Sequence, residues 1–451
     1  MSLFDFFRKK VPGVRPGLYE YIGAGDLAGY KFHLRVEKDG TGILIVNASR
    51  IIHCNETAVY YIYSIFQGDT EDGIVKLVKK DFKGVTKEEI IDDYRRIREV
   101  IVSFSNSEDV CPVTHFNMEM IEPFSKELSA PYRMDLALTY KCQNKCLHCY
   151  SSSPRESKEL ATGEWVEIIK RLWEAGIPHI VFTGGEATLR GDLPELIQAA
   201  EEYGAITGLL TNGRKLSNRD YLSGLINSGL DHIQITVESH LESVHDKMVN
   251  TTGAFKETIE GLKNAIETPV YTITNTTLTK ENALDFPKTL EFLKGLGIET
   301  FACNGIIYSG KGPTSGLGIH ENELEPILTR IKDKALELDM RFMWYTPTRY
   351  CRFNPVSEGL GVKRCTAGMF NMCVEPNGNV LPCQSYYKSV GNILDDNWEK
   401  IWNHPELISI RNRDWVDEKC KTCGDFDLCG GGCPLYQETG EIYCDNVMGD
   451  G

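Results

Sequence analysis

Three cysteines between Cys142 and Cys149 have the residue type and spacing for metal chemistry. Cys142, Cys146 and Cys149 follow the apolar stretch 134–140, which predicts a strand that ends just before them. Three thiolates placed in this way can bind three irons of a 4Fe–4S cluster and leave the fourth iron open to a substrate or a second cofactor. A zinc site that lacks a fourth ligand and a redox thiol pair are the alternative interpretations.

A second motif, Gly184-Gly185-Glu186, follows the run 180–182, which predicts the next parallel strand. Two glycines at the carboxyl end of a strand allow the backbone to approach a ligand closely. The carboxylate of Glu186 can accept a hydrogen bond from an ammonium group. The tripeptide alone is common in turns. Its position one strand–helix unit after the cysteines makes it a more specific indication of a ligand site.

Together these two motifs resemble the radical S-adenosylmethionine (AdoMet) superfamily. The resemblance implies that the open iron chelates AdoMet, that Gly184, Gly185 and Glu186 contact its amino group, and that the reduced cluster generates a 5′-deoxyadenosyl radical. It places His148 beside the adenine. Thr236 and Glu238 stand where relatives carry residues that help to hold the AdoMet carboxylate. The arginine of those relatives is missing here, so Lys247 or backbone groups are expected to replace it.

The carboxyl-terminal cysteines form a second pattern with one Cys-x2-Cys pair, from Cys420 to Cys423. A zinc ribbon needs two such pairs. The order of the cysteines and of Gly378 instead resembles the SPASM extension of radical AdoMet enzymes, which implies two auxiliary 4Fe–4S clusters. The implied ligands of auxiliary cluster I are Cys365, Cys383 and Cys433. The implied ligands of auxiliary cluster II are Cys420, Cys423, Cys429 and Cys444.

Auxiliary cluster I needs a fourth ligand or has an open iron. Cys373 is the first candidate for the fourth ligand because it lies in the loop between Cys365 and Cys383, and Cys351 is the second. Three 4Fe–4S clusters and AdoMet are therefore the expected cofactors.

The elements that must position these residues alternate between strands and helices, which predicts an α/β fold. We expect a partial (β/α)6 barrel related to the eight-fold TIM barrel, with the motifs at the carboxyl ends of the strands. The predicted strands are 133–139, 178–183, 205–211, 232–238, 270–277 and 300–307. The expected domains are a module at 1–108, a linker at 109–130, the barrel at 131–315, a bridging segment at 316–364 and a SPASM domain at 365–451.

The amino-terminal module reads as a hairpin followed by three helices, the outline of a winged helix. Asn55 and Thr86 are predicted helix caps, the latter in a capping box with Glu89. The order of elements resembles the peptide chaperone of pyrroloquinoline-quinone biosynthesis (PqqD-like), a recognition element that binds a precursor peptide as an added β-strand. A purely stabilising accessory domain is the alternative.

Composition limits the classes of function. The 451 residues carry a net charge of −15, which argues against nucleic-acid binding, and no apolar run has the length of a membrane span. The first ten residues lack the features of a signal peptide, and fifteen cysteines favour metal ligation in a reducing, cytoplasmic setting.

The sequence predicts a radical AdoMet enzyme that crosslinks a ribosomally made precursor peptide through a thioether or carbon–carbon bond. An external electron donor of the flavodoxin or ferredoxin type is expected. The alternatives are a radical AdoMet enzyme that acts on a small molecule or cofactor precursor, and a catalytically silent iron–sulfur protein. No general base can be assigned, although Glu238 and Asp246 are carboxylates near the expected rim.

Overall fold

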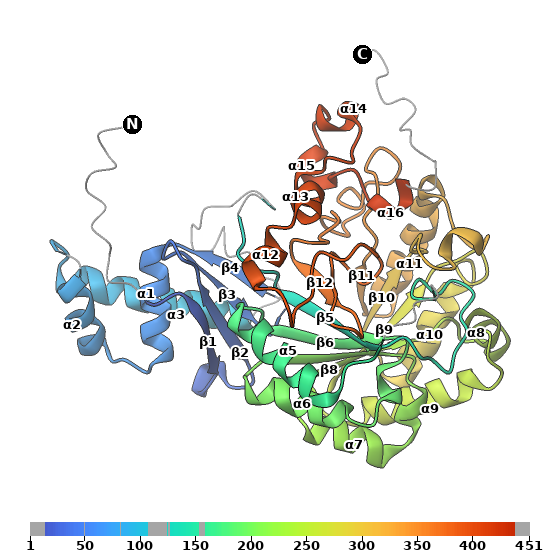
Figure 1. Cartoon of the computed structure of the whole chain (residues 1–451), viewed down its shortest axis with the longest axis horizontal. Helices are drawn as coiled ribbons and strands as arrows, with labels where there is room; N and C mark the ends of the chain where they lie inside the picture. The colour runs from blue at the N-terminus through green and yellow to red at the C-terminus, as the bar shows by residue number, and fades with distance from the viewer. Residues whose placement is uncertain are drawn as a thin grey trace. The chain divides into compact units, whose positions relative to one another are not determined.

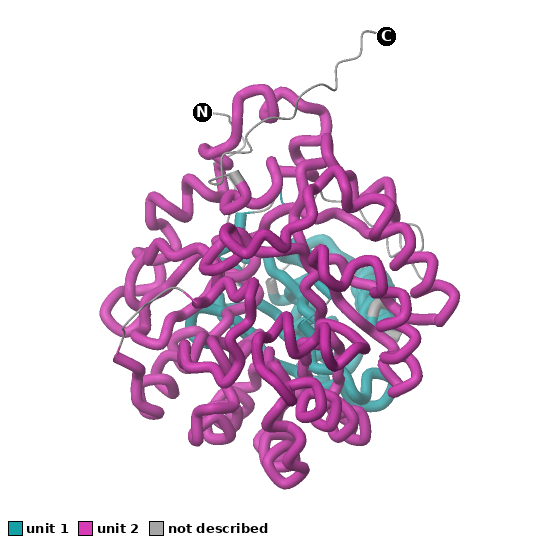
Figure 2. The backbone as a smooth tube through the Cα atoms, turned by 90° about the vertical axis from the view of Figure 1, so that its right-hand side faces the viewer, with its two compact units in different colours: residues 1–129, 173–178 teal, residues 130–172, 179–451 magenta. Residues whose placement is uncertain are grey.

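The structure, a computed structural model, describes residues 14–48, 50–81, 83–106, 124, 127–152 and 158–437. Contacts divide them into two units, which Figure 2 colours separately. Unit 1 holds the described residues up to Ser129 together with Trp173–Pro178, and unit 2 holds Ala130–Leu172 and the described residues from His179 onward. The expected domain boundaries stay predictions.

Unit 1 combines a four-stranded antiparallel sheet with three helices (Figure 1). The predicted hairpin and the three predicted helices are present, and the sequence reading missed the two outer strands, β1 and β4. The strands run in the order β1, β2, β3, β4, with bounds Gly17–Ile22, Lys31–Val36, Gly42–Val46 and Arg50–Cys54. The helices are α1 (Glu56–Phe66), α2 (Glu71–Asp81) and α3 (Lys87–Asn106).

Local signals explain where these helices begin. The Asn55 side chain accepts a hydrogen bond of 2.8 Å from the backbone N–H of Ala58, which caps α1. Thr86 and Glu89 form the predicted capping box, since each side chain accepts from the backbone N–H of the other residue. The apolar face of α1 packs on the sheet, with Phe32, Leu34, Leu44, Val59 and Ile62 in one buried cluster.

Unit 2 is built on one large sheet, in which all strands are parallel except the one at the end of the sheet (Figure 1). The strand order is β11, β10, β9, β8, β7, β6, β5, β12, β13. The six predicted strands are β5 (Arg133–Thr139), β6 (His179–Gly184), β7 (Ile206–Thr211), β8 (His232–Thr236), β9 (Tyr271–Thr277) and β10 (Thr300–Asn304). The α/β partial-barrel prediction is therefore confirmed.

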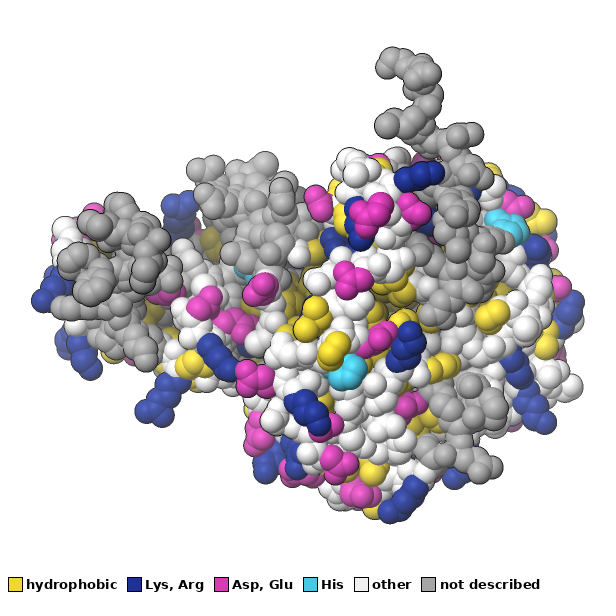
Figure 3. Space-filling model, turned by 45° about the horizontal axis from the view of Figure 1, so that its top comes forward, with side chains coloured by type: hydrophobic (Ala, Val, Ile, Leu, Met, Phe, Trp, Pro, Cys, Tyr) yellow, Lys and Arg dark blue, Asp and Glu magenta, His cyan; other side chains and the backbone are white. Residues whose placement is uncertain are grey.

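Helices connect the parallel strands. They are α5 (Thr162–Glu174), α6 (Leu193–Glu202), α7 (Arg219–Asn227), α8 (Glu242–Val249), α9 (Ala254–Ile266), α10 (Phe286–Leu296) and α11 (Leu324–Glu337). Their apolar faces are buried, as Trp165, Ile168 and Leu172 of α5 show. No helix in the described ranges is both long and apolar enough to cross a membrane. Acidic and basic side chains are interspersed on the face shown in Figure 3.

Three strands lie beyond the six that the sequence indicates. A seventh parallel strand, β11 (Arg341–Trp344), follows α11 and pairs with β10. On the other side, β12 (Asn371–Val374) pairs in parallel with β5, and β13 (Val380–Leu381) pairs with β12. The segment that begins near residue 365 thus extends the barrel sheet. Its short helices are α12 (Trp398–Trp402), α13 (Pro405–Asn412), α14 (Glu418–Lys421), α15 (Phe426–Cys429) and α16 (Pro434–Gln437).

Candidate iron–sulfur and AdoMet site

The Cys142–Cys149 loop follows β5 at the rim formed by the carboxyl ends of the strands. The thiols of Cys142, Cys146 and Cys149 lie within electrostatic range of one another. Burial raises the pKa of Cys142 to about 11 and also raises the pKa of Cys146. Thiols in such surroundings are protonated unless a cation binds them, so the donor set fits a metal group that takes thiolates.

The spacing of donors also bears on the kind of metal group. Among the described residues, no three His, Cys, Asp or Glu side chains are close enough to hold a single metal ion. A 4Fe–4S cluster binds each thiolate on a different iron and therefore uses donors that are farther apart. The three neighbouring thiols of the loop are of the donor type that such a cluster binds, and their role as its ligands stays a prediction.

Helix α8 supports the loop from one side. The backbone N–H of Lys145 donates to the carbonyl of Val249, and that of Leu147 donates to the carbonyl of Met248, each at 3.0 Å. These carbonyls belong to the last turn of α8, where helix carbonyls lack partners within the helix. The short loop thereby gains regular hydrogen bonds without strand or helix structure of its own.

The two glycines of the second motif pack against the backbone at the end of β5 and the start of the cysteine loop. The sequence analysis did not predict this contact. A Cβ atom on Gly184 would lie 2.2 Å from the carbonyl oxygen of Thr139, and one on Gly185 would lie 2.4 Å from that of Lys141. The N–H of Gly185 donates to Thr139, and that of Glu186 donates to Lys141. The glycines thus extend the β5–β6 pairing into the cysteine loop.

Glu186 is 1% exposed and its carboxylate is held by protein donors. Oε1 accepts from the N–H and hydroxyl of Thr188 and from the hydroxyl of Thr211, and Oε2 accepts from the N–H of Asn212 at 2.8 Å. Burial raises the pKa of Glu186. Oε2 accepts from one protein donor, against three at Oε1, so Oε2 is the oxygen that can also accept from an ammonium group.

His148 and Glu238 meet at the end of β8. Nε2 of His148 lies 3.1 Å from Oε1 of Glu238, whose side chain is fully buried. Oε2 of Glu238 accepts from the N–H of Thr277 at the end of β9. Thr236, the last residue of β8, is half-buried and pairs with Asn275. The predicted AdoMet contacts thus lie on neighbouring strand ends, and their role toward AdoMet stays a prediction.

Contacts from other strand ends to the loop were not singled out from the sequence. Arg214, after β7, donates to the Asn144 side chain at 2.7 Å. The N–H of Lys311, after β10, donates to the carbonyl of Cys149 at 3.0 Å. The prediction that strand order brings the motifs to one rim is confirmed by these contacts. The only sign of these contacts in the sequence is that polar residues follow each predicted strand.

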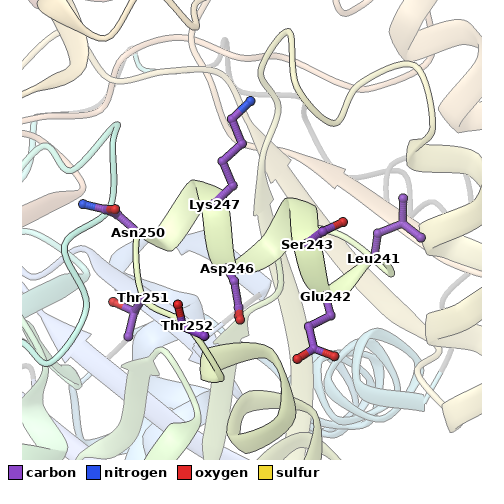
Figure 4. Close-up of a pocket in the computed structure, with 8 residues that line it drawn as sticks. All are labelled: Leu241, Glu242, Ser243, Asp246, Lys247, Asn250, Thr251 and Thr252. Atoms are coloured by element: carbon purple, nitrogen blue, oxygen red, sulfur yellow. The ribbon is translucent and has the colours of Figure 1, made fainter.

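A surface pocket of about 770 Å³ lies along α8 (Figure 4). Asp246 and Lys247 point to opposite sides of α8 in this view. The Asp246 carboxylate accepts from the N–H groups of Gly253 and Phe255, which start α9. Lys247 forms an ion pair of 2.5 Å with Glu281. Asp246 therefore acts as a helix cap, and its geometry does not favour the role of general base.

The carboxyl-terminal thiols lie in two sets, and their roles as cluster ligands stay predictions. Within the first set, Cys365, Cys383 and Cys433 lie in electrostatic range of one another. Within the second set, the same holds for Cys420, Cys423 and Cys429. The seventh predicted ligand, Cys444, lies outside the described residues.

The two candidates for a fourth ligand of auxiliary cluster I lie in different places. Cys373 is buried on β12 and packs with Ala137 and Leu381, within electrostatic range of Cys383. Cys351 is disulfide-bonded, and its neighbour Tyr350 donates its N–H to Sγ of Cys429. The first candidate is therefore close to the first thiol set, and the second is close to the other set.

Glycines connect the two sets. Gly430, Gly431 and Gly432 have φ values of +59°, +81° and +81°, a left-handed run that other residues adopt only with strain. This run carries the chain directly from Cys429 of one set to Cys433 of the other.

Comparisons with known proteins identify two family matches in this chain. Residues 136–293 match the Radical SAM superfamily, and residues 365–424 match the SPASM family, described as an iron–sulfur cluster-binding domain. The PqqA peptide cyclase of Bradyrhizobium diazoefficiens is 28% identical over 67% of this chain and 81% of its own length. The AdoMet-dependent heme synthase of Oleidesulfovibrio alaskensis is 26% identical over 65% of this chain and 80% of its own length.

Among solved structures, Streptococcus suis SuiB bound to its precursor peptide SuiA has a similar fold. The TM-score is 0.65 at 17% identity, and the match covers 94% of this chain and 97% of SuiB. At this identity the likeness concerns the fold, which it extends to both units.

Proposed function

The chain is a radical SAM enzyme with a SPASM domain, and from this premise we propose that it crosslinks a ribosomally made precursor peptide through a thioether or carbon–carbon bond. The observation that carries the proposal is unit 1, whose antiparallel sheet has strand edges at β1 and β4. An extended peptide can add to such an edge through main-chain hydrogen bonds. The fold match to SuiB, which includes this unit, and the PqqA peptide cyclase relative both support it.

Residues at the rim have distinct tasks in this proposal. Cys142, Cys146 and Cys149 would hold the first cluster, which would supply radical chemistry from AdoMet when both are bound. Glu186 offers Oε2 to the AdoMet ammonium. His148 and Glu238 fix the loop against the end of β8, close to Cys146, on whose thiol the Glu238 charge acts.

The carboxyl-terminal thiol sets hold two auxiliary clusters, for a total of three. Each set lies within unit 2, the same unit as the Cys142–Cys149 loop. An external flavodoxin- or ferredoxin-type protein supplies the electron that reduces the first cluster. The second candidate function, action on a small molecule, is favoured by the similarity to the heme synthase.

Anaerobic turnover tests the proposal. The reconstituted enzyme is incubated with AdoMet, dithionite and synthetic peptides encoded by short reading frames beside its gene. We expect 5′-deoxyadenosine together with a peptide that has lost two hydrogens. Release of 5′-deoxyadenosine with every such peptide unchanged would favour the small-molecule function. A form that lacks residues 1–108 is the matched control, and peptide turnover equal to that of the full chain would contradict a leader-binding role for unit 1.

A further inference from the structure

Arg413 is the most deeply buried cation near the carboxyl-terminal thiols. Its side chain is 2% exposed, and Nη2 donates to the carbonyl of Cys365, a member of the first thiol set. Nε and Nη1 are buried and have no hydrogen-bond partner among the described residues. No carboxylate in the described ranges forms an ion pair with this guanidinium. A buried cation with two unused donors needs an anion close by.

The backbone of Arg413 points to the same requirement. Arg413 follows α13 in the left-handed conformation, with φ of 60° and ψ of 38°. Glycine or asparagine normally occupies this position because other residues are strained there. An arginine at this position, with its side chain turned inward, is costly unless the guanidinium has a favourable interaction.

A second cation lies beside the first. Arg364 precedes Cys365 and is in electrostatic range of Arg413, Cys365 and Cys429. Its Nη1 donates to the carbonyl of Asp427 at 2.7 Å. A Cβ atom on Gly430 would lie 2.8 Å from Nε of Arg364, so the left-handed glycine leaves the room that this side chain occupies. Arg364 thus lies between members of both thiol sets.

Two neighbouring guanidinium groups repel each other, and the repulsion is stronger away from water. A 4Fe–4S cluster held by thiolates has a net negative charge that grows by one when the cluster is reduced. Its reduction potential depends on nearby charge and on hydrogen bonds to its sulfurs. The unused donors of Arg413 beside Cys365 match this anion in sign and in hydrogen-bonding capacity.

We propose that Arg413, assisted by Arg364, donates hydrogen bonds to the auxiliary cluster at Cys365, Cys383 and Cys433 and raises its reduction potential. This inference rests on the proposed auxiliary clusters. Arg413 acts here as a positioning and potential-setting residue that does not touch the substrate. By stabilising the reduced form, the two cations make this cluster a better electron acceptor.

Redox titration tests the proposal in a Cys142/Cys146/Cys149→Ala background, where auxiliary clusters alone contribute to the spectra. The variants are Arg413→Gln, Arg413→Lys and, as a matched control, Arg411→Gln. Arg411 lies in the last turn of α13, but its guanidinium donates to the carbonyls of Gly368 and Trp402 and stacks on the Trp402 ring. We expect Arg413→Gln to make the midpoint potential of one cluster more negative, while Arg413→Lys and Arg411→Gln stay near the parent. Equal potentials for Arg413→Gln and the parent, at equal iron content, would overturn the proposal.

A second measurement, made on the protein with Arg413 in place, tests the proposal even if the Arg413 variants fail to bind the cluster. The parent is labelled with ¹⁵N-arginine, its auxiliary clusters are reduced, and ¹⁵N hyperfine coupling is recorded by pulsed EPR. We expect a coupling that disappears in Arg413→Lys. About eight irons per chain without any ¹⁵N coupling would refute the arginine contact alone, whereas absence of iron from this background would refute the auxiliary clusters themselves.

Discussion

Nε2 of His148 lies 3.1 Å from Oε1 of Glu238, and this pair joins the cysteine loop to the end of β8. The side chains are 10% and 0% exposed, so the pair is largely shielded from water. The other carboxylate oxygen binds the N–H of Thr277 on β9. One buried carboxylate therefore connects two strand ends to the loop between Cys146 and Cys149.

Replacement of Glu238 by alanine should destabilise the apo-protein. The change removes the buried acceptor of the Thr277 N–H and the carboxylate that faces the His148 ring, which costs about 1–3 kcal/mol of unfolding free energy. Glu238→Gln retains an acceptor for Thr277 and should recover most of this loss. Urea unfolding under reducing conditions measures both values. Equal stability of Glu238→Ala and the wild type would show that the contact contributes nothing.

The three-cysteine loop should hold one third of the iron. Three clusters correspond to about twelve irons per chain after anaerobic reconstitution, and the Cys142/Cys146/Cys149→Ala variant should hold about eight. The variant should also produce no 5′-deoxyadenosine, because the loss concerns the cluster with the open iron. Iron content and AdoMet cleavage are the measurements. About four irons in the wild type, unchanged in the variant, would move the metal chemistry to the carboxyl-terminal cysteines.

A methyl group at Gly185 should damage the same loop without touching a cysteine. The added Cβ atom would lie 2.4 Å from the Lys141 carbonyl and 2.6 Å from that of Tyr140, and backbone atoms cannot move aside cheaply. We expect Gly185→Ala to lose about 1–3 kcal/mol of stability and to bind iron poorly at the first cluster. Gly224→Ala is the matched control, since a Cβ atom on this helical glycine meets no atom within 4 Å. Full iron content in Gly185→Ala would contradict the packing argument.

The sequence predicted those parts of the fold in which local and periodic signals agree. Buried runs such as 133–139 gave strands with nearly correct bounds, and Asn55 and Thr86 marked helix starts that the structure reproduces. The short strands β11 and β12 were missed because four residues carry little periodicity and because their pairing partners are distant in sequence. Only the folded sheet brings Cys373 opposite Asp135.

The site could be predicted in its residue types but not in its contacts. Cysteine spacing indicated the thiol sets, whereas nothing in the sequence showed that Gly185 packs on backbone or that Asp246 caps α9. Arg413 gave no signal at all, because an arginine after a helix normally faces water. Burial and unpartnered nitrogens are properties of the folded chain, and they alone distinguish this arginine from its neighbours.

Acid sensitivity should arise at the opposite end of the strands from the cysteine loop. Nε2 of His179 lies 2.8 Å from Nε2 of His232, so one ring donates and the other accepts, and the two cannot both be protonated. Burial, reinforced by the charge of Arg133, lowers the pKa of His232 to about 4. In the unfolded chain this pKa is about 6.5. Between these values the unfolded chain binds a proton that the native chain does not, so native stability falls as the pH falls through this window.

This titration should remove about 2 kcal/mol of unfolding free energy between pH 7 and pH 5, and stability should be insensitive to it above pH 7. Urea unfolding of the apo-protein at both pH values measures the difference. His232→Gln should flatten the dependence by this amount, because glutamine does not titrate. His320→Asn is the control, since His320 is exposed and asparagine also caps helices. A pH dependence in His232→Gln as steep as that of the wild type would place the acid sensitivity at another group.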